Sequence, residues 1–194
     1  MLTMSLGWTS GPIILTRFLH KTTNKTAISI GALLLTAGSG YALTFGPSTT
    51  MVECLSAFVI IGLGMGFVSI CTLLVVQGAL PPTDLGVATS SQQFSRTLGG
   101  TIGVAIAGAV ATGSLMSQLR SAGEKIPVNV FNQVTESMEN IFKPEFFDPL
   151  SSEIKGILQG AVSNSISTVF WIVFGTAILT LIFSFLLPGE SKEG

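Results

Sequence analysis

Three polar side chains in a mainly small and apolar stretch are the first candidates for chemistry in this sequence: Gln92, Gln93 and Arg96. An ionisable residue inside a bilayer is costly and therefore indicates a substrate or ion pathway. If the helix enters the membrane near Gly86, Arg96 lies about 15 Å deep, at 1.5 Å per residue. Alternatively, Arg96 lies at the interface, because the uncharged stretch Leu98 to Met116 is already long enough to span. Both glutamines share these two interpretations, and the sequence leaves them open.

Glu53 is a fourth candidate, at the external start of an expected helix. One interpretation is structural, because a carboxylate in the first turn interacts favourably with the helix dipole and costs little at the interface. The other is proton or cation binding. The structural interpretation is favoured, because no basic partner is near Glu53 in the sequence.

The sequence gives little support for a catalytic site or a metal-binding site. Two cysteines and one histidine, His20, cannot make a metal motif by themselves. Cys54 and Cys71 lie in one expected helix, about 25 Å apart at 1.5 Å per residue, so they cannot form a disulfide with each other. None of the expected spans pairs a nucleophile with a base. We expect no metal, no cofactor and no enzymatic activity.

The composition is that of a membrane protein. The 194 residues are 47% hydrophobic and only 10% charged, and their mean hydropathy is +0.68. A soluble domain carries about 25% charged residues, so lipid is the expected solvent for much of this surface. A net charge of −1 gives no electrostatic case for binding nucleic acid.

The uncharged stretches predict an all-α protein with four complete transmembrane helices and part of a fifth. The loop after the first segment carries Arg17, Lys21 and Lys25 and no acid, which places it in the cytoplasm. By parity, the C-terminus is then cytoplasmic in a multi-pass protein of the inner membrane. The expected parts are a partial span 1–18, spans 27–45, 51–79 and 86–116, an external loop 117–164 with amphipathic helices, a last span 165–188 and a tail 189–194.

Glycines occur in the least bulky of these spans. Apolar bulk does not draw helices together in lipid, so small residues that permit close backbone approach are expected at helix contacts. The expected packing residues are Gly62, Gly64, Gly66, Gly99, Gly100, Gly103 and Gly108.

The succession PPTDLGVATSSQQFSRTLGGTIGVAIAG, residues 81–108, resembles the second-to-last helix of 14-span drug:proton antiporters, the EmrB/QacA-like branch of the major facilitator superfamily. The stretch GWTSGPIILTRFLHKTTNKTAISIG, residues 7–31, is loosely similar to that family's basic loop motif, without its acidic residue and loop glycine. The resemblance implies the C-terminal part of a major facilitator fold.

Several expectations follow from this resemblance. It implies proton-coupled efflux of lipophilic or cationic compounds by alternating access, with lipid, substrate, protons and missing N-terminal helices or a partner chain as partners. Segment 1–18 is shorter than the ~20 residues that cross a bilayer, so we expect a fragment. The alternatives are a non-transporting helical subunit that docks to a partner through its glycine faces, and, less favoured, an integral-membrane enzyme.

Overall fold

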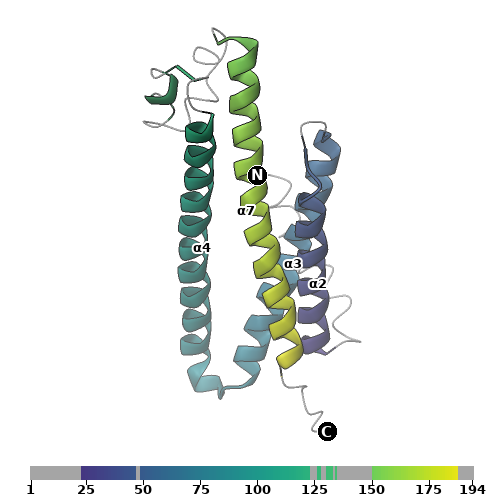
Figure 1. Cartoon of the computed structure of the whole chain (residues 1–194). Helices are drawn as coiled ribbons and strands as arrows, with labels where there is room; N and C mark the ends of the chain where they lie inside the picture. Colours follow the sequence, from purple (N-terminus) through teal and green to yellow (C-terminus); the bar gives the residue numbers. More distant parts are fainter. Residues whose placement is uncertain are drawn as a thin grey trace. The chain divides into compact units, whose positions relative to one another are not determined.

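The computed structural model describes residues 23–46, 49–122, 126–127, 130–132, 134 and 150–187. Every regular element assigned in these residues is helical. The partial span 1–18, the loop residues Arg17 and Lys21 and the tail 189–194 lie outside the described residues. The elements are α2 (Asn24–Ala42), α3 (Met51–Gly78), the short η1 (Pro82–Asp84), α4 (Leu85–Ser121) and α7 (Ser152–Leu186) (Figure 1).

The chain divides into two compact units. The first comprises Met1–Thr101 and Phe170–Gly194, and the second comprises Ile102–Val169. Helices α4 and α7 each supply residues to both units. Each unit is described by itself below.

Three of the described segments are long and apolar enough to cross a membrane: α3, the stretch Pro82–Ser121 that contains α4, and α7. The predicted all-α membrane fold is therefore confirmed. Helix α2 has 19 residues but is not among the three, because its first turn carries the polar Asn24 and Lys25. It ends at Ala42, three residues before the predicted end at Phe45, so crossing by the segment 27–45 stays a prediction.

Helices α2 and α3 lie against each other in the first unit, in contact at glycines. A Cβ atom added to Gly64 would lie 2.7 Å from the carbonyl oxygen of Gly31, and one added to Gly31 would lie 3.0 Å from that of Gly64. On α3 the buried Ala57, Gly64 and Cys71 are seven residues apart, which keeps them on one side of the helix. The two backbones therefore meet directly, without side chains between them.

The corner between α3 and α4 is held by a side-chain hydrogen bond. The Gln77 amide Nε2 donates to the Thr89 hydroxyl at 2.9 Å, and that hydroxyl donates to the Leu85 carbonyl at 2.8 Å. Pro81 and Pro82 separate the helices here, since proline lacks the N–H that would continue α3. This hydrogen bond joins the last turn of α3 to the start of α4.

Helices occupy both ends of the range 117–164, which the sequence assigned to an external loop. α4 continues to Ser121 rather than ending at residue 116, and α7 begins at Ser152 rather than at residue 165. The stretch from Ser152 to residue 164, where the sequence predicts amphipathic helix in the loop, is therefore continuous with the last span. The reason is burial: Leu158 is 0% exposed and packs in a cluster with Leu115 and other apolar residues of the second unit. That cluster holds Leu115, Leu119, Ile126, Val130, Val134, Leu158 and Ala161.

The contact between Gly31 and Gly64 predicts a sharp stability difference between two glycine substitutions. Gly64→Ala should lower the free energy of unfolding in detergent by about 1–3 kcal/mol, because the methyl group meets backbone atoms that cannot rotate away. Gly78→Ala, at the end of the same helix, is the control, because a Cβ atom there has no neighbour within 4 Å among the described residues. Unfolding titrations with sodium dodecyl sulfate measure both. Equal stability of the two variants would contradict the contact.

Candidate functional site

The polar candidates of the sequence lie on the first half of α4. Gln92 is half-buried, whereas Gln93 and Arg96 are exposed. Residues three and four apart are neighbours on a helix surface, so both glutamines lie beside Arg96 on one side of α4. The hydroxyl of Thr97 donates to the Gln93 carbonyl of the same helix at 2.9 Å. The structure thus gathers the three candidates into one polar patch, and their place relative to a bilayer stays a prediction.

The glycines of α4 follow this patch and are uncovered. A Cβ atom added to Gly99, Gly100, Gly103 or Gly108 would meet nothing within 4 Å among the described residues. On α3, by contrast, Gly62, Gly64 and Gly66 are all buried. Among the described residues, Gly64 therefore has a partner in α2, whereas the glycines of α4 have none. That the glycines of α4 pack against other helices stays a prediction, and those helices would lie outside the described residues.

Glu53 has a structural role at the start of α3. Its carboxylate oxygen Oε2 accepts from the Thr50 backbone N–H at 2.8 Å, and its own N–H donates to the Thr50 hydroxyl at 3.4 Å. These two contacts form a capping box, which satisfies two backbone donors that a helix start leaves without partners. This arrangement agrees with the structural interpretation of Glu53.

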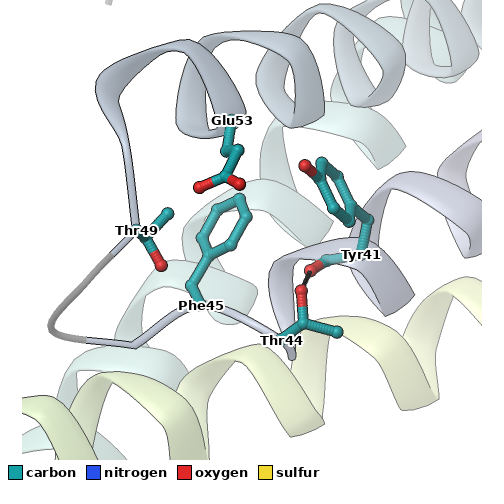
Figure 2. Close-up of a pocket in the computed structure, with 5 residues that line it drawn as sticks. All are labelled: Tyr41, Thr44, Phe45, Thr49 and Glu53. Carbon is teal, nitrogen blue, oxygen red and sulfur yellow. Dashed lines mark hydrogen bonds between the residues drawn. The ribbon is translucent and has the colours of Figure 1, made fainter.

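Glu53 also borders a small open hollow beside the turn between α2 and α3. The hollow has a volume of about 160 Å³ and is lined by five side chains. Figure 2 shows the Glu53 carboxylate next to the Phe45 ring, with Tyr41 on one side and Thr49 on the other. The Thr44 hydroxyl donates to the Tyr41 carbonyl at 2.7 Å and so fixes the end of α2 (Figure 2). The lining residues are Tyr41, Thr44, Phe45, Thr49 and Glu53.

Aromatic rings pack against one another beside this hollow. The ring of Phe45 makes edge-to-face contacts with Tyr41, at a centroid distance of 5.6 Å, and with Phe170 of α7, at 6.1 Å. Trp171 and Phe174 make a further edge-to-face pair at 6.1 Å, and Phe174 also lies against Gly40. The first unit thus combines one carboxylate with several aromatic rings at this end of α2.

A polar cluster in the second unit was not predicted from the sequence. The Gln118 amide nitrogen lies 3.3 Å from the Ser165 hydroxyl and 3.3 Å from the Ala161 carbonyl. In return, the Asn164 amide donates to the Gln118 carbonyl oxygen at 3.0 Å. These bonds join α4 to α7. Gln118 and Asn164 fell in the range predicted to be a loop, and the small residues that flank Asn164, Ser163 and Ser165, were a signal in the sequence.

Among the described residues, no three histidine, cysteine, aspartate or glutamate side chains gather closely enough to hold a metal ion. The candidate site therefore consists of the polar patch and glycines of α4, and of the hollow beside α3.

No family model and no solved structure matches the chain. Curated proteins do. The MFS-type efflux pump elcC of Phaeosphaeria nodorum is 29% identical over 168 residues, which are 86% of this chain and 28% of that protein. The multidrug transporter protein MdtP of Bacillus subtilis is 28% identical over 174 residues, which are 80% of this chain and 32% of that protein. This chain is a homologue of MFS-type efflux pumps.

A third such homologue is the aspyridones efflux protein of Neocamarosporium betae, 26% identical over 85% of this chain and 28% of its own length. The chain thus spans less than a third of the length of each of these three efflux proteins. Fungal and bacterial relatives alike are transporters. These similarities confirm the expected likeness to membrane transporters of the major facilitator type.

In this homologue of efflux pumps, the contact between Gln118 and Asn164 should contribute measurably to helix association. A double-mutant cycle of Gln118→Ala and Asn164→Ala should give a coupling free energy of about 0.5–1.5 kcal/mol, because hydrogen bonds across membrane helices are worth about this much. Thr168→Ala is the control, since among the described residues the Thr168 hydroxyl donates to the Asn164 carbonyl of its own helix and not to another helix. The free energy of unfolding of each variant in mixed micelles gives the coupling. A coupling free energy of zero would contradict a stabilising hydrogen bond between Gln118 and Asn164.

Proposed function

We propose that this chain is the C-terminal part of a major facilitator transporter of the 14-span drug:proton antiporter branch. In this proposal, the protein exports lipophilic or cationic compounds by alternating access, driven by proton influx. The observation that carries the proposal is the similarity of 80–86% of the chain to named efflux and multidrug transporters. The long apolar helices of the described residues support it independently.

The glycines of α4 are the proposed contact with the rest of the transporter. A Cβ atom at any of them would meet nothing within 4 Å among the described residues. Gly99, Gly100 and Gly103 form one bare face of the helix, and bare glycine faces are where membrane helices approach one another closely. Further helices of the complete protein would cover this face and slide or rock against it. Gln92, Gln93 and Arg96 would then border the path of substrate or ions, because they precede the same face by one or two turns.

The proposed setting is the inner membrane, with the C-terminus in the cytoplasm and the region between α4 and α7 outside. The proposed partners are the lipid bilayer, a small lipophilic or cationic substrate, protons, and the missing N-terminal helices. No reaction catalysed on the substrate is proposed.

The uncovered face of α4 also favours a second candidate, a non-transporting membrane subunit that docks to a separate protein through Gly99, Gly100 and Gly103. The reading frame upstream of Met1 distinguishes the two. An adjoining frame with further spans supports the transporter, and a promoter directly ahead of Met1 supports the subunit.

Drug accumulation tests the proposed transport directly. Cells that express the complete gene product should retain less of a fluorescent lipophilic cation than cells without it. A protonophore that collapses the proton gradient should abolish the difference, because coupled export depends on that gradient. Equal accumulation with and without the protein would contradict efflux, and efflux that persists without a gradient would contradict proton coupling.

A glycine substitution on α4 tests the proposed contact face. Gly103→Leu should reduce export at least about tenfold in a correctly inserted protein, because the larger side chain separates helices that must touch. Gly175→Leu on α7 is the matched control, since a Cβ atom at Gly175 also meets nothing within 4 Å among the described residues and its helix is richer in bulky apolar residues. Unaltered export by Gly103→Leu would contradict the contact role.

A further inference from the structure

Helix α4 is held at its two ends and exposed between them. Near its start, the Thr89 hydroxyl accepts a hydrogen bond from the Gln77 amide of α3. Near its end, Leu115 is buried in the core of the second unit. Every residue from Gln93 to Ile106 is exposed. Packing among the described residues therefore restrains the middle of this helix little.

The border between the two compact units lies within this exposed stretch. The first unit includes the chain up to Thr101, and the second begins at Ile102. Helix α4 continues across the border as one helix, from Leu85 to Ser121 (Figure 1). A movement of one unit against the other therefore requires α4 to bend.

Three glycines make α4 easiest to bend at this border: Gly99, Gly100 and Gly103. After proline, glycine is the poorest helix former, because its backbone loses the most freedom in a helix. Sharp helix bends occur at prolines or at glycine and serine pairs, and α4 contains no proline. A Cβ atom added at any of the three would meet nothing within 4 Å among the described residues. Contacts in this part of the chain therefore do not require glycine there.

Two threonine hydroxyls act on the helix next to the same glycines. The Thr101 hydroxyl donates to the Thr97 carbonyl at 2.9 Å, and the Thr97 hydroxyl donates to the Gln93 carbonyl at 2.9 Å. In an α-helix, each of these carbonyls also accepts from the backbone N–H four residues later. Sharing a carbonyl in this way slightly destabilises a helix and often bends it. The threonines and the glycines thus weaken the same part of α4.

Helix α7 crosses the same border between Val169 and Phe170. The Thr168 hydroxyl donates there to the Asn164 carbonyl at 2.9 Å, which is the same kind of bond as in α4. Bulky side chains, however, stand where α4 has glycines, because Val169 and Phe170 are followed by Trp171. The sharper bend is therefore expected in α4.

We propose that Gly99–Gly103 is a hinge in α4, at which the helix bends so that its two ends, each held in a different unit, change direction relative to each other. The proposal goes beyond the proposed function, in which these glycines supply a contact face. The contact face concerns what lies against α4, whereas the hinge concerns the stiffness of its backbone. It depends on neither a substrate nor a proton gradient.

Distances between two spin labels within α4 test the hinge. One pair of labels at Ser91 and Ala109 and another at Phe94 and Thr112 flank it, at positions that are all exposed and about 27 Å apart at 1.5 Å per residue. The pairs lie on different sides of the helix, so together they detect a bend in any direction. Labels on encoded ketone side chains leave the native cysteines unchanged. Double electron–electron resonance on the full chain in lipid nanodiscs gives each distance distribution.

Helix α3 supplies the matched control pair, Ser56 and Leu74, which has the same separation in sequence and is also exposed. This helix also contains three glycines, Gly62, Gly64 and Gly66, but it lies within one unit and packs against α2. The wider of the two α4 distributions should be at least about twice as wide as that of α3. Equal widths would overturn the hinge.

Alanine substitutions separate stiffness from packing. Gly99→Ala combined with Gly100→Ala favours the helix, while alanine remains small enough for close approach of another helix. This variant should narrow the α4 distributions to about the width of the α3 pair. Unchanged width in this variant would overturn the hinge.

Gly86→Ala combined with Gly108→Ala is the matched control variant. Both positions lie in α4 away from the border, and a Cβ atom at either meets nothing within 4 Å among the described residues. The α4 distributions should keep their width in this variant. Equal narrowing by both double variants would overturn the hinge, because the breadth would then report low helix propensity along all of α4. Circular dichroism checks that each variant keeps its helices.

These distances are measured without transport. A narrow α4 distribution in a protein that still exports drugs from cells overturns the hinge and leaves the proposed function intact. A wide distribution that only Gly99→Ala with Gly100→Ala narrows, in a protein that exports nothing, supports the hinge and overturns transport.

Discussion

Close approach of helix backbones is the constraint on which this structure depends. In lipid, apolar side chains gain nothing by leaving their solvent, so bulk hydrophobicity cannot draw helices together. The contact between α2 and α3 shows the alternative. Because Gly31 and Gly64 have no side chains, the carbonyl oxygen of each lies only 2.7–3.0 Å from where a Cβ atom of the other would be. A larger residue at either position would separate the pair and leave Cys71, now 0% exposed, uncovered.

Hydrogen bonds between polar side chains are the second means of association. In the second unit the Gln118 amide reaches the Ala161 carbonyl and the Ser165 hydroxyl of α7. In the first unit the Ser184 hydroxyl donates to the Ser29 hydroxyl at 3.3 Å, which joins α7 to α2. Lipid offers polar groups no water to hydrogen-bond, so such bonds satisfy these groups within the protein. They also specify which helix faces meet.

The fold class and most helix positions could be predicted from composition and from uncharged stretches. Thr50 and Glu53, three residues apart, mark the start of α3, and Pro81 follows its end closely. The starts and ends of α4 and α7 could not be predicted in the same way. Polar residues such as Gln118 and Asn164 resemble a loop in sequence. Their mutual hydrogen bond, across 46 positions of the chain, and the burial of Leu158 together support helix beyond the predicted ends.

Less of the candidate site was predictable. Glu53 and the polar patch with Arg96 were found from residue type, because charged and amide groups are rare in apolar stretches. The hollow was not found, since Phe45 and Phe170 are distant in sequence and either could have been an ordinary apolar residue. The described residues give no contact for the glycines of α4, so their packing role stays a prediction, and no pattern within α4 names a partner.

The most direct test of the central claim is a scan of oxygen accessibility along α3. Single spin labels at successive positions from residue 55 to residue 74, in lipid nanodiscs, report how far each side of the helix faces lipid. The account predicts lower oxygen accessibility at the buried Ala57 and Cys71 than at the exposed Ser56 and Leu74. Uniformly high accessibility to oxygen would contradict it, because α3 would then be a lone helix in lipid, and uniform accessibility to a water-soluble reagent would contradict the membrane setting itself.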